Sequence, residues 1–163
     1  MLEEKIKTRE ELKEILKSLR KERKKIVTTN GAFDILHVGH IKSLTEAKSY
    51  GDVLIVGLNS DLSIKSYKDP SRPIMCEENR AIVIAALSCV DYVSIFNELT
   101  PIELLKLVKP DYHIKSKSGF KGIETRVVEE NGGKIILIDD FPNMSTTKII
   151  GEICKNYPNG SWL

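Results

Sequence analysis

This sequence of 163 residues has few cysteines, no long apolar run and no large excess of one charge. The three cysteines, Cys76, Cys89 and Cys154, are odd in number and widely spaced, and no Cys-x-x-Cys pair occurs. This pattern argues against a disulfide framework and against a thiolate zinc site. No apolar run approaches the ~18 residues that span a bilayer, and the first residues lack the apolar core of a signal peptide. We therefore expect a cytoplasmic protein without a membrane partner.

The charges nearly cancel. The sequence has 25 Lys and Arg against 23 Asp and Glu, a formal net charge of +2. This balance argues against a dedicated nucleic-acid-binding protein. The basic run at residues 20–25 is interpreted as the solvated end of a helix, with attraction of phosphate as the alternative. Hydrophobic residues make up 41% and charged residues 29%, which is typical of a globular chain. At ~100–200 residues per domain, the length favours one domain.

Apolar runs of strand length alternate with helical periodicity along most of the chain. Thr8 and Glu11 have the spacing of a capping box, and Leu12, Ile15 and Leu16 follow at helical intervals. Strands are then predicted at 25–29, 52–58, 92–96, 112–114 and 134–138, and helices at 38–50, 77–89, 101–108, 123–130 and 145–154. This alternation predicts a single α/β domain, a Rossmann-like doubly wound parallel sheet of about five strands. We divide the chain into an N-terminal helix (1–24), the main domain (25–155) and a tail (156–163).

The segment after the first predicted strand carries the strongest chemical signal. Gly31 allows a tight turn close to a ligand, and His37 and His40 lie three residues apart at a helix start, so they share one face. Gly39 between them leaves room for a bulky anion, and a helix N-terminus attracts phosphate. Two alternatives are a pair of ordinary structural histidines and a His-x-x-His metal site, which lacks a local third ligand. The glycine-rich dinucleotide and P-loop motifs are absent, so the predicted anion site is built on histidines.

Several further segments occur in register with this one: Gly57-Leu58-Asn59-Ser60-Asp61, Arg72-Pro73-Ile74, Glu77-Glu78-Asn79-Arg80, Cys89-Val90-Asp91-Tyr92-Val93 and Ser145-Thr146-Thr147-Lys148-Ile149-Ile150. Together they resemble the cytidylyltransferase-like branch of the His-x-Gly-His nucleotidylyltransferase superfamily, over roughly residues 25–155. Within that branch, the sequence is most similar to the stand-alone heptose-1-phosphate adenylyltransferases. One stretch departs from their pattern: where they carry a Lys-Gly-Gly-Asp-like sequence, this chain has Lys115-Ser116-Lys117-Ser118-Gly119-Phe120, in which only Lys115 matches.

The resemblance implies an enzyme of the nucleotidylyltransferase class. The expected reaction is ATP plus heptose 1-phosphate giving ADP-heptose and pyrophosphate. A cytidylyltransferase that uses CTP with a small phosphorylated polyol or a phosphonate is the alternative, and a nucleotide-binding module without turnover is a third reading. The expected partners are an NTP and a phosphorylated small molecule, and no nucleic acid. Mg²⁺ is expected to arrive with the NTP, which supplies most of its ligands, and pairing of two copies is expected from the superfamily.

The resemblance also implies roles for particular residues. Catalytic roles are expected for His37, His40 and Lys68. The expected nucleotide-binding residues are Thr29, Asn30, Gly31, Ala32, Phe33, His37, Gly39, His40, Asn59, Arg80, Ser145, Thr146 and Thr147. The expected substrate-binding residues are Lys42, Lys65, Arg72 and Lys115, and no protein ligand to a metal is expected. Helix capping is the alternative role for residues 145–147, since Ser and Thr favour helix starts. For Asp91, which lies in one of the matching segments, the alternative to a role in the site is that of a turn residue before a strand.

Overall fold

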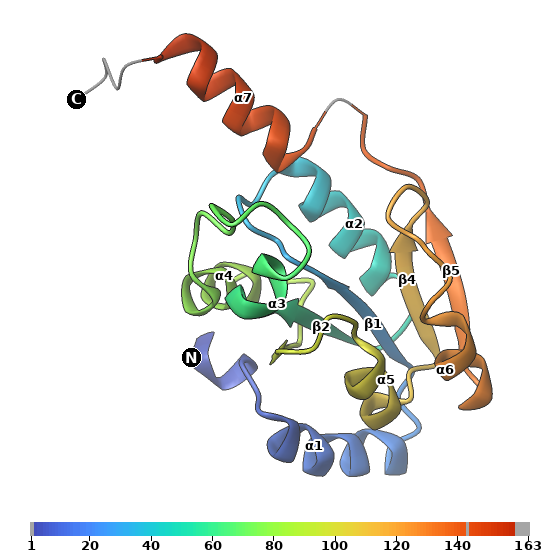
Figure 1. The fold of residues 1–163 in the computed structure, drawn as a ribbon. Helices are drawn as coiled ribbons and strands as arrows, with labels where there is room; N and C mark the ends of the chain where they lie inside the picture. Colours follow the sequence, from blue (N-terminus) through green and yellow to red (C-terminus); the bar gives the residue numbers. More distant parts are fainter. Residues whose placement is uncertain (1, 143, 159–163) are drawn as a thin grey trace.

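Five strands form one parallel sheet in a computed structural model that describes residues 2–142 and 144–158 (Figure 1). The strands are β1 (Ile26–Gly31), β2 (Val53–Asn59), β3 (Tyr92–Phe96), β4 (Tyr112–Ser116) and β5 (Lys134–Ile138). Their order in the sheet is β3-β2-β1-β4-β5, and every neighbouring pair is parallel. The predicted Rossmann-like α/β fold is confirmed.

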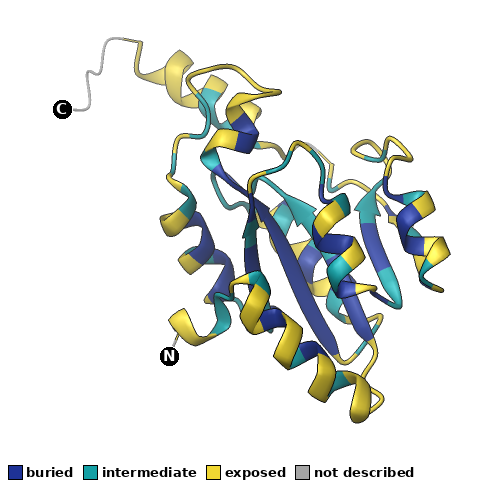
Figure 2. Cartoon of the chain, turned by 60° about the horizontal axis from the view of Figure 1, so that its bottom comes forward, coloured by how far each residue is buried: buried dark blue, intermediate teal, exposed yellow. Residues whose placement is uncertain are grey.

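Helices cover both faces of the sheet. On one face lie α2 (Val38–Lys48) and α4 (Glu77–Ala85), and on the other lie α1 (Arg9–Lys21), α5 (Ile102–Val108) and α6 (Thr125–Glu130). The side chains of β2 alternate accordingly: Leu54 and Val56 pack against α2 and α4, whereas Val53 and Ile55 pack against α1 and α5. Figure 2 shows the buried strands between helices whose outer faces are exposed. Every residue of β2 is buried, as expected for a central strand with both faces covered.

The boundaries differ from the predictions in a few places. The helix predicted at 77–89 ends at Ala85, and the chain then turns into β3. Asp91 fixes this turn because its carboxylate accepts a hydrogen bond from the Leu54 amide at 2.7 Å and pairs with Lys48. The short helix α3 (Asp61–Lys65) was not predicted, since five residues are too few to show a helical period. The 3₁₀ helix Leu2–Lys5 was missed as well.

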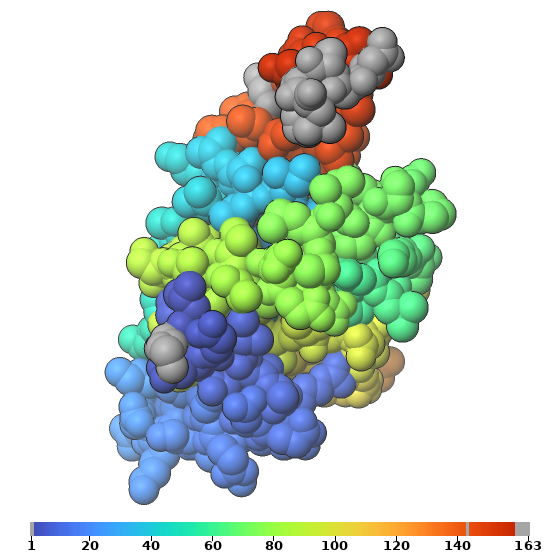
Figure 3. Space-filling model, turned by 90° about the vertical axis from the view of Figure 1, so that its left-hand side faces the viewer, coloured from blue at the N-terminus to red at the C-terminus, as the bar shows by residue number. Residues whose placement is uncertain are grey.

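The last helix stands away from the sheet. Helix α7 (Thr146–Asn156) has no buried residue and projects from the body (Figures 1 and 3). It runs to Asn156, so the predicted tail begins inside its last turn, and the part of that tail at 159–163 lies outside the described residues. The segment predicted as a separate N-terminal helix packs on the main domain, since Leu12 and Leu16 of α1 belong to the same core as Ile26 and Ile55.

The sheet opens at one point. The ladder between β1 and β4 contains only the pairs Val27–Tyr112 and Thr28–His113, although both strands continue for three more residues. Here the strand order reverses, because the chain builds β2 and β3 on one side of β1 and β4 and β5 on the other. In open α/β sheets, ligands bind at such a switch point, beyond the carboxyl ends of the strands. Among the described residues, no helix is long and apolar enough to cross a membrane.

The packing of β2 predicts a large cost for truncating its side chains. Leu54 is fully buried, so Leu54→Ala should lower the free energy of unfolding by about 3 kcal/mol through lost burial and a new cavity. Leu62→Ala is the matched control because Leu62 is 71% exposed, and it should change stability by less than about 0.5 kcal/mol. Urea denaturation measures both values. Equal losses in the two variants would contradict the assignment of β2 to the core.

Candidate active site

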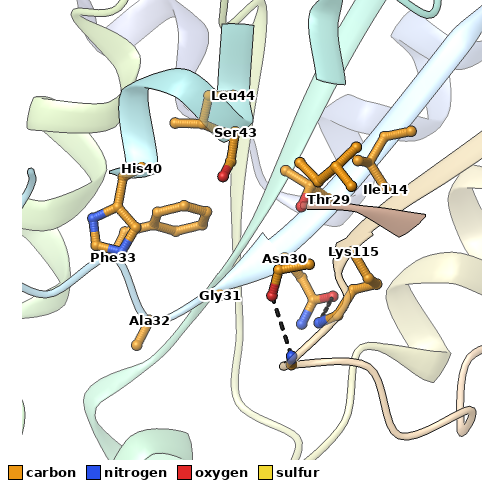
Figure 4. A pocket seen from close by; sticks show the side chains of 13 residues that line it. Thr29, Asn30, Gly31, Ala32, Phe33, His40, Ser43, Leu44, Ile114 and Lys115 are labelled. Carbon is orange, nitrogen blue, oxygen red and sulfur yellow. Dashed lines mark hydrogen bonds between the residues drawn. The ribbon is translucent and has the colours of Figure 1, made fainter. Parts of the chain in front are cut away.

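Two adjoining cavities occupy the open end of the sheet. The smaller, of about 230 Å³, lies between the ends of β1 and β4 and the side of α2 (Figure 4). The larger, of about 550 Å³, extends along the start of α2, the loop at residues 68–72 and the start of α7. His40, Ser43 and Ser116 line both cavities. A ligand that fills both must therefore pass beside the His40 side chain.

The two predicted histidines lie together at the start of α2. His37 is the N-cap residue of this helix, and its ring stacks on that of His40 with 3.8 Å between ring centroids. Gly39 leaves space for this arrangement, since a Cβ there would lie 3.0 Å from the His37 ring and 3.4 Å from Phe141. The edge of the Phe33 ring packs against His40, with 5.2 Å between centroids. The ring of His40 is therefore held on two sides.

Burial favours the neutral form of both imidazoles. It lowers the pKa of His40 to about 4, and electrostatic repulsion from the neighbouring His37 ring and the Lys68 ammonium adds to this effect. Burial also lowers the pKa of His37. The Nδ1 atoms of both rings are buried without a hydrogen-bond partner among the described residues. A polyphosphate bound beside them would raise both pKa values, because a nearby opposite charge favours the protonated form.

Cationic and hydroxyl groups line the larger cavity. Lys68 and Arg72 contribute the cations, and Ser145, Thr146 and Thr147 lie at the start of α7. Partial desolvation lowers the pKa of Lys68, and the charge of Arg72 lowers it further. The Ser145 hydroxyl accepts a hydrogen bond from the Lys148 amide at 3.1 Å, so it caps α7 while it also faces the cavity. The capping role and the predicted contact with phosphate are thus compatible in this geometry.

Asp34 holds the cationic wall in place. Its buried carboxylate accepts hydrogen bonds from Arg72 Nε at 2.7 Å and from the amides of Ile74 and Met75. Burial alone would raise the pKa of Asp34, but these amide bonds and the charge of Arg72 together lower it. The ion pair of Asp34 with Arg72 joins the loop after β1 to the loop before α4. Sequence reasoning did not select Asp34, although it stands within the segment that carries the two histidines.

Arg80 and Asn59 lie behind the cavities and line neither of them. The Arg80 guanidinium is fully buried and donates to the carbonyls of Ala32, Asn59 and Met75 and to the Asp61 carboxylate. The Asn59 side chain donates to the Ser63 hydroxyl at 3.0 Å. Their predicted contact with nucleotide finds no geometric support here. Arg80 instead ties together the ends of β1 and β2 and the start of α4.

The four predicted substrate-binding residues separate into two groups. Arg72 lines the larger cavity and Lys115 the smaller one, whereas Lys42 and Lys65 are exposed and line neither. Lys42 lies on α2, whose buried residues are Gly39, Leu44 and Ala47. Further residues of the cavity walls carry no motif and were not predicted: Ser43 on α2, Ser116 at the end of β4, and the loop residues Ser118, Gly119, Asp140, Phe141 and Met144.

The site has no evident set of metal ligands. Among residues 2–142 and 144–158, no three His, Cys, Asp or Glu side chains form a group that could hold a metal ion. Asp140, a carboxylate on the wall of the larger cavity, accepts hydrogen bonds from the amide and the hydroxyl of Ser118. The parallel sheet, with stacked histidines and flanking cations at its open end, defines an α/β protein with a candidate anion-binding site.

Comparison with known proteins gives the family. The model of the cytidylyltransferase-like family matches residues 28–154. The protein HldE of Syntrophotalea carbinolica, described as bifunctional, is 48% identical over 160 residues, which cover 96% of this chain and 32% of that protein. The bifunctional protein HldE of a Nitratiruptor species is 51% identical over 148 residues, covering 91% of this chain and 32% of the relative. The chain thus spans about a third of the length of these relatives.

Solved structures agree with this relationship. A lipopolysaccharide core biosynthesis protein from Thermoplasma volcanium superposes with a TM-score of 0.64 at 30% identity, covering 72% of this chain and 98% of the other. A pantoate-beta-alanine ligase from Francisella tularensis superposes with a TM-score of 0.59 at 19% identity and shares the fold, covering 93% of this chain and 76% of the other. The chain belongs to the cytidylyltransferase-like family. It is accordingly an enzyme of the nucleotidylyltransferase class.

The hydrogen bonds of Arg80 predict that lysine cannot replace it. Arg80→Lys should cost about 3 kcal/mol of folding stability, because an ammonium group cannot reach the same carbonyls and the Asp61 carboxylate together. Arg126→Lys is the matched control, since Arg126 forms an exposed pair with Glu130. That change should leave the unfolding transition unchanged within the error of the measurement. Thermal or urea denaturation compares the two variants, and similar losses would refute the bracing role of Arg80.

The buried histidines predict a loss of stability in mild acid. His113 is fully buried, with Nδ1 2.8 Å from the Thr28 hydroxyl, and burial lowers its pKa to about 3, with a contribution from the charge of Lys115. Below about pH 6.5 the unfolded chain takes up protons that the folded His40 and His113 do not, so stability falls as the pH falls.

Nuclear magnetic resonance of the imidazole groups measures the low pKa values of His40 and His113 on which this loss of stability depends. The folded protein should show His40 and His113 still neutral at about pH 5.5, where a free histidine is mostly protonated. A midpoint near 6.5 for either residue would contradict the arrangement described.

Proposed function

We propose that this protein transfers a nucleoside monophosphate from an NTP to a phosphorylated sugar, with ATP and heptose 1-phosphate as the substrates. The observation that carries the proposal is the stacked pair His37 and His40 at the junction of two cavities, beside Lys68 and Arg72. Phosphoryl transfer needs in-line positioning and stabilisation of charge more than a nucleophilic side chain. The site offers both of these elements.

The two cavities suit different parts of an NTP. The smaller has apolar walls from Phe33, Leu44, Ile114 and Ile138, which suit a nucleoside. The larger carries the cations and the start of α7, which suit the phosphates. This assignment puts the α-phosphate beside His40. Lys115 then lies on the nucleoside side of the site, whereas the sequence analysis expected it to bind the acceptor.

The reaction follows from this placement. A phosphate oxygen of the acceptor attacks the α-phosphorus, the new P–O bond forms, and the bond to the β-phosphate breaks so that pyrophosphate leaves. His40 and His37 hydrogen-bond the α-phosphoryl oxygens as charge develops on them. Lys68 and Arg72 balance the charge of the pyrophosphate. The acceptor phosphate enters from the open side of the larger cavity.

Mg²⁺ enters this proposal as part of the NTP. The cavity walls carry cations and hydroxyl groups, and Asp140 is engaged by Ser118. Such a lining suits a metal ion whose ligands are mainly phosphate oxygens and water. We assign it no protein ligand.

Pairing of two copies of the chain stays a prediction from the resemblance.

The choice of heptose 1-phosphate and ATP is supported by the high identity with the HldE proteins and by the motifs shared with the heptose enzymes. One observation favours the alternative with CTP. The stretch that departs from the heptose enzymes includes Ser116 and Gly119, and both line the smaller cavity, where the base would bind. A module without turnover is disfavoured, since both histidines face a cavity lined by cations.

Pyrophosphate release tests the proposal. Mg²⁺ and each of ATP, CTP, GTP and UTP are combined with heptose 1-phosphate, glycerol 3-phosphate or a hydroxyalkylphosphonate. Release confined to ATP with heptose 1-phosphate is the expected result. Release confined to CTP with another acceptor would retain the chemistry and replace the substrates, and no release with any pair would reject the function.

His40→Ala should lower kcat about 100-fold or more while NTP binding weakens much less, because the lost contact strengthens in the transition state. Glu46→Ala, on the exposed side of the same helix, is the matched control and should keep kcat within about twofold. Steady-state kinetics with the preferred pair of substrates gives both numbers. An equal loss of binding and turnover in His40→Ala would contradict its role in the transition state.

A further inference from the structure

Glu124 is a buried carboxylate that lies outside all the motifs. Its side chain is 4% exposed. It stands at the N-cap position of α6, where short polar side chains such as Asp or Ser commonly accept a hydrogen bond from the helix amides, and its own side chain makes no such bond. Instead Oε1 lies 3.5 Å from Lys115 Nζ, and Oε2 is buried without a partner among the described residues. The carboxylate is therefore directed at Lys115 rather than at its own helix.

Lys115 is held from two sides at the wall of the smaller cavity. Its Nζ donates to Asn30 Oδ1 at 3.1 Å, and Glu124 faces it from the other side (Figure 4 shows Lys115 and Asn30). The Lys115 side chain is only 13% exposed, and the residue lines the cavity. An ammonium group has three N–H donors. Asn30 accepts one of them and Glu124 pairs with the ammonium group at 3.5 Å, so donor capacity remains for a ligand in the cavity.

Other contacts fasten the same loop to the sheet edge. Lys117 pairs with Asp139 at 2.7 Å, and Ser118 donates to Asp140 through both its amide and its hydroxyl. Anchoring of this loop therefore does not require the Lys115–Glu124 pair. Two opposite charges that are nearly removed from water depend on each other strongly, because loss of one leaves the other uncompensated. The carboxylate thus holds the Lys115 ammonium in place.

We propose that Glu124 is a positioning residue for nucleotide selection. It holds the charged Nζ of Lys115 at the wall of the smaller cavity, where Lys115 donates a hydrogen bond to an accepting atom on the base or the ribose of the NTP. This inference rests on the proposed function and deepens it, because it assigns recognition of the nucleoside to a pair that lies away from the reacting phosphates.

The test is a double-mutant cycle on nucleotide affinity. Calorimetry measures the binding of α,β-methylene analogues of ATP and CTP to the wild-type chain, to Lys115→Met, to Glu124→Gln and to the double variant. Each single change should weaken binding of the preferred analogue about tenfold. It should also bring the affinities for the ATP and CTP analogues closer together. The double variant should be no weaker than Lys115→Met, since Glu124 acts through Lys115.

Kinetic measurements and a control separate positioning from a merely structural role. Glu124→Gln should raise the KM for the NTP about tenfold while the KM for the acceptor stays unchanged and kcat stays within about threefold. Asp139→Asn breaks the other lysine–carboxylate pair of the same loop and should change affinity less than twofold.

Three results would overturn the inference: additive losses in the double variant, a raised KM for the acceptor in place of the NTP, or a fall in stability with unchanged nucleotide affinity. Absence of analogue binding to the wild-type chain would also overturn it. Binding that follows the cycle in a chain without turnover would sustain this inference and reject the proposed function alone.

Discussion

The separation of β1 from β4 after the Thr28–His113 pair is the constraint on which the rest of the site depends. Up to that pair the two strands share a ladder, and beyond it they diverge while each still pairs with its outer neighbour. The Thr28 hydroxyl and His113 Nδ1, 2.8 Å apart, satisfy each other at the last shared step. The smaller cavity opens directly above this step, so the position of the last ladder pair sets the depth of the cavity.

Buried polar groups give the open end its rigidity. A crevice at the end of a sheet is bounded by loops, and loops are usually the mobile parts of a fold. Here Asp34 binds two amides and a guanidinium and so joins the loop after β1 to the loop before α4. Arg80 binds three carbonyls and a carboxylate and so joins the ends of β1 and β2 to the start of α4. Each brace connects segments far apart in sequence. Hydrogen bonds to buried charged groups are stronger than neutral ones, so a few of them hold these loops in place beside the cavities.

The periodicity of the sequence predicted the five strands and the main helices because a sheet covered on both faces demands continuous apolar runs. It also located the histidine pair, since a strand followed by a helix places the intervening residues at a ligand-binding edge. The partners of Arg80 could not be predicted, because a guanidinium suits a nucleotide phosphate and a cluster of carbonyls equally well, and only the fold decides between them. Lys42 could not be placed for the same reason: it lies on α2, the helix that carries His40, yet its side chain is exposed.

Glu124 illustrates why part of a site escapes sequence reasoning. It lies nine residues beyond Lys115, in a segment whose pattern indicates only a helix start. Its importance comes from a turn of the chain that brings it beside β4, and no local spacing records such a contact. The reverse holds for His37 and His40, whose three-residue spacing on one helix is itself the geometric relation that matters. Residues that act through contacts within one element can be read from the sequence, whereas those that act across elements require the fold.

The protonation state of the histidines completes the electrostatic argument. In the free protein the low pKa of His40 avoids a third cation next to Lys68 and Arg72, which would repel both. A triphosphate brings several negative charges into the same space, and the imidazoles can then gain protons or donate hydrogen bonds without that repulsion. A site that includes histidine thus carries less positive charge when empty and becomes more cationic as an anion binds. A site built only on lysine and arginine would carry its full repulsion in the empty state.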